Sequence, residues 1–147
     1  VVNVKLKLAL LWIVLMWFYA YNDIMSFFRQ DMVEGILAGN IEGITFTQPF
    51  MFAMALLMSF PIFMILLSVM LPARLNRGVN IGAGIFHLVL LGITATVGDE
   101  GPWAYYALYM AFEGVIIALI TWTAWKWPTT DGVPHGAPRA TGVELGI

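Results

Sequence analysis

Four long apolar stretches, separated by shorter polar segments, follow one another along this chain. They cover residues 8–28, 49–71, 78–95 and 103–127. A helix needs about 20 mostly apolar residues to cross the hydrocarbon core of a bilayer. The pattern therefore predicts an all-α fold, an integral membrane four-helix bundle with four transmembrane helices, formed by residues 1–128.

Three prolines lie in the second apolar stretch or directly after it. Pro49 suits the first turn of a helix, whereas Pro61 lies mid-span, removes one backbone hydrogen bond and predicts a kink. Pro72 is expected to end this helix, and a short basic loop would then lead to Arg77.

The segment between the first two stretches is more polar. Its apolar residues recur at helical spacing, at Met32, Val33, Ile36 and Leu37. This pattern predicts a short amphipathic helix lying at the membrane interface, which Gly35, Gly39 and Gly43 would break into turns.

Composition supports a membrane location. Hydrophobic residues make up 61% of the chain and charged residues only 11%, against roughly 25% charged residues in soluble domains. The absence of cysteine excludes disulfides and thiolate metal sites. A net charge of −2 gives no reason to expect a nucleic-acid partner.

Lysine and arginine collect on one side of the predicted bundle. That side carries Lys5, Lys7, Arg74, Arg77, Lys126 and Arg139, and the other carries Arg29 among the acids Asp31, Glu34, Glu42, Asp99 and Glu100. Cytoplasmic loops are rich in lysine and arginine, so both termini are expected to be cytoplasmic.

Three ionisable residues fall inside the predicted spans, namely Asp23, His87 and Glu113. From the helical rise, His87 would lie roughly 12 Å, Glu113 roughly 20 Å and Asp23 roughly 27 Å from the cytoplasmic ends. An ionisable group in the membrane costs at least ~2.5 kcal/mol and normally faces the bundle interior. The three are therefore expected to face inward at different depths.

Each acid follows a tyrosine by four residues, Tyr19 before Asp23 and Tyr109 before Glu113. Residues at this spacing share a helix face, and a tyrosine hydroxyl can donate to a carboxylate. One interpretation is a polar pocket or proton path. The other is that these groups only fix the register of the helices.

His87 raises a separate hypothesis because Ala83 precedes it by four residues. A small residue at that offset leaves room for a flat macrocycle, and neutral imidazole is a good axial ligand. The pattern is similar to that of antenna polypeptides, so a chlorophyll-type pigment or haem at His87 is an alternative to no cofactor. A bis-histidine haem is not expected, since His135 lies in the tail.

The third stretch begins with small residues that would let helices approach closely. They are Gly78, Gly82, Ala83 and Gly84. The sequence shows no nucleophile–base set, no metal-ligand motif and no phosphate-binding loop, so neither an enzyme nor a metal site is predicted.

Residues 129–147 form a cytoplasmic tail rich in glycine, proline and threonine. Such a tail cannot bury enough apolar surface to fold alone. We expect a partner outside the bundle to order it.

Several motifs together resemble a family of small bacterial four-span membrane proteins of unknown function, distantly similar in layout to DoxX-like proteins. They are V-K-L-K-L-A-L-L-W at 4–12, F-Y-A-Y-N-D at 18–23, P-x-x-M-I-x-L-S at 61–68, N-R-x-x-N-I at 76–81 and A-W-K-W-P at 124–128. The resemblance implies a bacterial inner membrane location and a paired role for Asp23 and Glu113, but no established activity. His87 does not belong to it.

Two functions are consistent with these observations. The first is a non-catalytic accessory or structural subunit of a larger membrane complex, respiratory or photosynthetic, with the lipid bilayer and other membrane subunits as partners. The second is a membrane protein that handles a small molecule or protons through a pocket around Glu113, Asp23 and His87.

Overall fold

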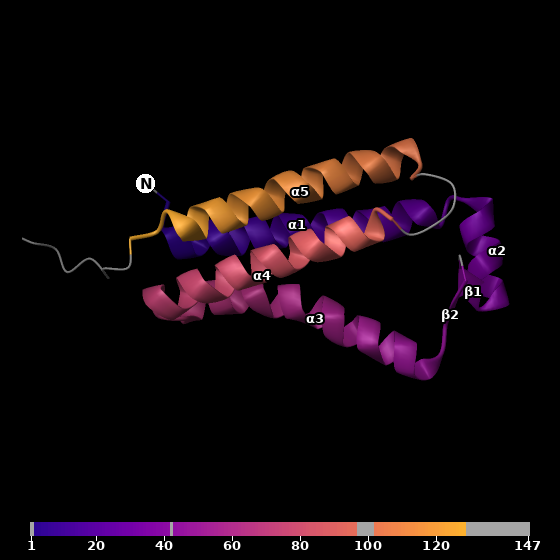
Figure 1. The fold of residues 1–147 in the computed structure, drawn as a ribbon, viewed down its shortest axis with the longest axis horizontal. Helices are drawn as coiled ribbons and strands as arrows, with labels where there is room; N and C mark the ends of the chain where they lie inside the picture. Colours follow the sequence, from indigo (N-terminus) through magenta and orange to yellow (C-terminus); the bar gives the residue numbers. More distant parts are fainter. Residues whose placement is uncertain (1, 42, 97–101, 129–147) are drawn as a thin grey trace, which may run out of the picture.

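The computed structural model describes residues 2–41, 43–96 and 102–128. Four long helices dominate it: α1 (Val4–Ser26), α3 (Gln48–Met70), α4 (Ala73–Thr94) and α5 (Ala104–Trp125) (Figure 1). Each is long and apolar enough to cross a membrane. The predicted all-α fold with four apolar helices is confirmed.

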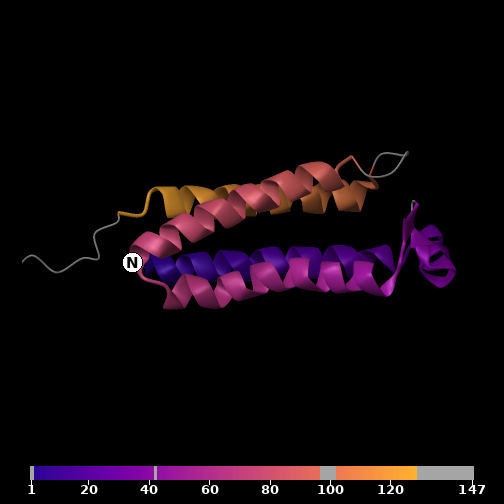
Figure 2. The same ribbon diagram turned by 60° about the horizontal axis from the view of Figure 1, so that its bottom comes forward.

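The bundle consists of two antiparallel pairs. One pair is α1 with α3 and the other is α4 with α5, and Figure 2 shows them as two layers. The layers meet mainly through α1 and α5, whereas α3 and α4, although consecutive in sequence, have far fewer contacts with each other. One side of the bundle is therefore less tightly closed than the others.

Side-chain caps fix where two of the long helices begin. The Asn3 side chain accepts from the backbone N–H of Lys5 at 2.9 Å, and Thr47 accepts from Phe50 at 3.3 Å. Each cap satisfies a donor that the first helical turn leaves free. Pro49 lies in the first turn of α3 as predicted, and α3 continues through Pro61. Figure 1 shows α3 changing direction along its course, as a proline inside a helix predicts.

The polar segment folds as the short helix α2 (Gln30–Ala38) followed by a small hairpin. Gly39, at φ 71°, ends α2 in the left-handed conformation. The strands β1 (Asn40–Ile41) and β2 (Ile44–Thr45) then pair antiparallel, and Asn40 Oδ1 accepts from the backbone N–H of Gly43 at 3.1 Å. The short helix agrees with the prediction, but the expected break at Gly35 is wrong, because α2 runs through this residue. The hairpin was not predicted.

The predicted basic loop over residues 72–77 is wrong, because α4 begins at Ala73, directly after Pro72. The polar residues that suggested a loop find their partners outside α4. Asn76 is fully buried, and its side chain donates to the backbone oxygen of Ser68 at 2.6 Å. Arg77 donates to the backbone oxygen of Trp127 at 3.4 Å.

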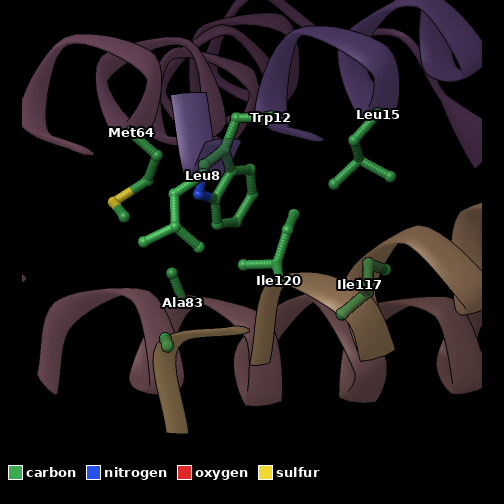
Figure 3. Packing of buried hydrophobic residues seen from close by; sticks show 8 residues of the cluster. Leu8, Trp12, Leu15, Met64, Ala83, Ile117 and Ile120 are labelled. Carbon is green, nitrogen blue, oxygen red and sulfur yellow. The ribbon is translucent and has the colours of Figure 1, made fainter. Parts of the chain in front are cut away.

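A dry core fills the half of the bundle that holds the start of α1 and the end of α5. We call this half the terminal half, and the opposite end, beside α2, the α2 end. The core consists of Leu8, Trp12, Leu15, Met64, Ala83, Ile117, Ile120 and Ala124. Figure 3 shows the α1 side chains pointing toward Ile117 and Ile120 of α5.

The four small residues predicted to let helices approach closely all lie in α4, in two different environments. Ala83 is buried in the core, and a Cβ added at Gly84 would collide with the Thr121 hydroxyl of α5. By contrast, a Cβ at Gly78 or Gly82 would meet no atom within 4 Å. Close packing in the described bundle therefore depends on Ala83 and Gly84.

Replacing Gly84 with alanine is expected to lower the free energy of unfolding by about 1–3 kcal/mol, the usual cost of overpacking. The Thr121 hydroxyl would have to leave its hydrogen bond with the Ile117 carbonyl. Gly82→Ala is the matched control and should not destabilise. Reversible unfolding of both variants in detergent checks this, and equal stabilities would contradict it.

Candidate functional site

A pocket of about 190 Å³ opens in the half of the bundle near α2. All four long helices contribute to its wall. The lining residues are Tyr19, Asn22 and Asp23 of α1, Leu57 and Met58 of α3, His87, Leu90, Leu91 and Thr94 of α4, and Tyr106 and Glu113 of α5. The three ionisable residues singled out in the sequence thus share one pocket.

Glu113 lies at the buried end of this pocket. Only 3% of its surface is exposed, and its Oε1 atom has no hydrogen-bond partner. A buried polar atom left unpaired costs about 1–3 kcal/mol. The unpaired carboxyl oxygen therefore lowers the stability of the fold.

His87 is 1% exposed and is held by aromatic neighbours. Its Nδ1 lies 3.1 Å from the Tyr19 hydroxyl, and its ring stacks on Tyr19 and on Phe60. Trp12 and Phe86 meet the ring edge-on. These contacts fix one ring nitrogen, while Nε2 has no partner.

Asn22 completes a group of three buried polar side chains around the pocket. It is 7% exposed, and its Oδ1 has no partner. These three side chains hold all the unpaired buried side-chain atoms found in residues 2–41, 43–96 and 102–128. Their convergence on one cavity, rather than scatter over the bundle, is the central feature of the site.

Three residues of the pocket lining are exposed. Asp23 and Thr94 lie at the α2 end, and Met58 lies in the middle of α3. Glu113 and His87, farther along the helices, are buried. The pocket thus runs from an accessible carboxylate to a buried one.

Contacts at the α2 end hold the rim of the bundle together. The Ser26 and Tyr105 hydroxyls lie 2.9 Å apart, and the Arg29 guanidinium lies 4.4 Å from the Trp103 ring centroid. Arg29 also hydrogen-bonds to Asp31, which lowers the pKa of that carboxyl group. The start of α5 is thereby tied to the segment that joins α1 to α2.

In the terminal half, the polar side chains between the helices satisfy one another. Asn80 Oδ1 accepts from Trp12 Nε1 at 2.7 Å and from the Ser68 hydroxyl at 3.2 Å. The Asn80 amide donates to Asn76 Oδ1 at 2.6 Å. Together with the dry core, this network closes the pocket at its inner end.

Two pairs of side chains predicted from their spacing in the sequence differ from the contacts in the structure. Tyr109 lies beside Phe18, at 5.7 Å between ring centroids, and is not among the lining residues. Tyr106, one turn earlier, lines the pocket instead. Tyr19 pairs with His87, although the i, i+4 spacing favoured Asp23.

The early start of α4 also changes the level of His87. Counted from Ala73, His87 lies roughly 21 Å along its helix, and Glu113 lies roughly 18 Å from the end of α5. The two residues are therefore nearly level. The predicted difference in depth came from beginning the helix at Gly78.

The site does not fit a pigment or a haem at His87. A pocket of about 190 Å³ is smaller than the ~300–1,000 Å³ typical of drug-sized ligands, and a macrocycle is larger still. Ala83, which would have to make room for the ring, is buried in the core. Among the described residues, no group of three or more histidine, aspartate or glutamate side chains could hold a metal ion.

The fold and pocket define a protein with four long helices, each apolar enough to cross a membrane, and a polar cavity between them. The chain belongs to the Family of unknown function (DUF6326), whose model matches residues 2–131. This match confirms the resemblance to a family of unknown function. No curated protein and no solved structure matches the chain.

Removing the Tyr19 hydroxyl should leave the buried Nδ1 of His87 without a partner. Tyr19→Phe is therefore expected to lower the free energy of unfolding by about 1–2 kcal/mol. Tyr109→Phe, on a tyrosine outside the pocket, should change it by less than about 0.5 kcal/mol. Denaturant titration of the two purified variants measures the difference, and a larger loss for Tyr109→Phe would refute the arrangement.

Proposed function

We propose that this protein binds a small polar molecule in the pocket around Glu113, Asp23 and His87. The observation that carries the proposal is that three side chains lining one cavity, Asn22, His87 and Glu113, each hold a buried polar atom without a hydrogen-bond partner. Buried polar groups are normally hydrogen-bonded. A ligand that pairs with these side chains would add hydrogen bonds that the bundle itself does not make.

A binding role fits the geometry better than proton passage across the membrane. Between the pocket and the terminal end, the buried polar residues are Ser68, Asn76 and Asn80, none of which titrates. Their hydrogen bonds are already made within the network. A pocket closed at one end suits a receptor, or a carrier in one of its conformations.

Among the described residues, the pocket lining holds no serine, cysteine or lysine. Its tyrosine and threonine hydroxyls are engaged in the fold: that of Tyr19 lies 3.1 Å from His87 Nδ1. The hydroxyl of Thr94 donates to the backbone oxygen of Leu91 at 3.0 Å. We therefore propose that the ligand leaves the pocket chemically unchanged.

The side of the membrane from which the ligand enters follows from the charge distribution. We propose a bacterial inner membrane with both termini in the cytoplasm, because lysine and arginine concentrate at the terminal end. The mouth of the pocket at the α2 end then faces outward. The similarity in layout to DoxX-like proteins is part of the same proposal.

The competing prediction is an accessory subunit of a respiratory or photosynthetic complex. It depended on a partner that orders residues 129–147, and this tail lies outside the described residues. It stays a prediction, and no contact within the described bundle favours it over a ligand pocket.

The free energy of unfolding of suitable variants distinguishes a binding site from polar groups that only hold helices together. Glu113→Leu should raise the free energy of unfolding of the ligand-free protein by about 1–3 kcal/mol, since it removes an unpaired buried group. Asn80→Leu is the matched contrast and should lower it by about 1–3 kcal/mol, because it leaves the Trp12 and Ser68 donors unpaired.

Unfolding of the purified protein in lipid nanodiscs would measure both variants. A ligand screen by thermal shift on the same samples should give compounds that stabilise the unsubstituted protein and not Glu113→Leu. Destabilisation by Glu113→Leu as large as that by Asn80→Leu would contradict the proposal and favour a packing role.

A further inference from the structure

The charged lining of the pocket has one sign. Its charged side chains are the carboxyl groups of Asp23 and Glu113, and neither lysine nor arginine is among the lining residues. Carboxylates within a membrane usually pair with an opposite charge. Among the described residues, His87 is the one basic side chain that lines the pocket.

The unpaired atoms point to the same ligand chemistry. Glu113 Oε1 and Asn22 Oδ1 are both acceptors without donors, and both side chains are more than nine-tenths buried. A protonated amine offers up to three N–H donors and a positive charge. It can therefore donate to acceptors of this kind and neutralise a carboxylate.

Aromatic rings add a second attraction for a cation. Tyr19 and Tyr106 line the pocket along with the two carboxyl groups. The face of an aromatic ring attracts a cation, by about 2 kcal/mol or more where water is excluded. The site thus combines carboxyl groups, unpaired acceptors and aromatic side chains, a combination suited to ammonium.

The remaining wall is apolar and limits the size of the ligand. Leu57, Met58, Leu90 and Leu91 supply this surface. A cavity of about 150 Å³ is large enough for benzene, so about 190 Å³ accommodates a slightly larger molecule. The ligand needs an apolar group of roughly that size beside its amine.

We infer that the pocket selects small organic amines in their cationic form, with the ammonium group at Glu113 and Asn22 and the apolar group against α3 and α4. This inference rests on the proposed binding function and narrows it to one chemical class.

Three probes with the same ring and different charge test the inference: benzylamine, benzyl alcohol and benzoate. The full chain is placed in nanodiscs of uncharged phosphatidylcholine lipids, which avoids attraction of amines to the membrane surface, and empty nanodiscs serve as the blank. Calorimetric titration at neutral pH should show benzylamine binding at least tenfold more tightly than benzyl alcohol. Benzoate should not bind.

Glu113→Gln should abolish the preference for the amine, whereas Glu34→Gln, which neutralises an exposed carboxylate on α2, should leave it unchanged. If Glu113→Gln proves unstable, Asn22→Ala removes the second acceptor and should weaken benzylamine binding at least threefold. Leu57→Trp, which fills the pocket, should abolish binding of every probe.

Two results would overturn the inference while leaving the proposed function in place. One is equal binding of amine and alcohol, both lost in Leu57→Trp. The other is tighter binding of benzoate, again lost in Leu57→Trp. Absence of binding by all three probes would overturn the amine assignment, and the Glu113→Leu stability test would then decide the proposed function independently.

Discussion

The hydrogen bonds around Asn80 are the constraint on which the asymmetry of the bundle depends. This side chain accepts from Trp12 of α1 and Ser68 of α3 while it donates to Asn76 of its own helix. Three helices are thereby locked together within the terminal half. Because each polar group there has its partner, that half can pack as a dry core.

The α2 end differs in its packing and in its hydrogen bonds. There, α3 and α4 move apart (Figure 1), and the pocket between the helices is lined by Asn22, His87 and Glu113, each with an unpaired atom. The bundle thus contains one polar network whose hydrogen bonds are made and one group of buried polar side chains with unpaired atoms. Unsatisfied buried groups persist at functional sites, where ligand binding offsets their cost.

His87 joins the two regions. Its ring packs edge-on against Trp12, whose indole N–H belongs to the Asn80 network, and its Nδ1 meets the Tyr19 hydroxyl. The network in the terminal half therefore positions a side chain of the pocket. Rigid support of this kind keeps a binding site close to the geometry that its ligand requires.

Much of this architecture was predictable from the sequence. The four apolar stretches gave the helices, and the cost of burying charge indicated that Asp23, His87 and Glu113 face inward. The start of α4 was misplaced because Asn76 and Arg77 suggested a loop, and their satisfaction depends on Ser68 and Trp127, distant in sequence. That error alone displaced His87 from the level of Glu113.

Of the remaining site features, some could have been predicted from the sequence and others could not. Asn22 follows Tyr19 by three residues and precedes Ser26 by four, which places all three on one face of α1. That spacing could have revealed it. The choice of Tyr106 over Tyr109, and of His87 as the partner of Tyr19, depends on how the helices are rotated against one another, which one sequence does not specify.

The central claim is that water-soluble molecules reach the pocket from the α2 end and stop at the dry core. The chain contains no cysteine, so single cysteines can be introduced one turn to either side of His87, at Leu91 in the pocket and at Ala83 in the core. A small, membrane-impermeant cationic methanethiosulfonate reagent is then applied to oriented vesicles. The account predicts that Leu91→Cys reacts from the α2 side and that Ala83→Cys reacts from neither side. Equal reactivity at the two positions, or no reaction at Leu91→Cys, would contradict it.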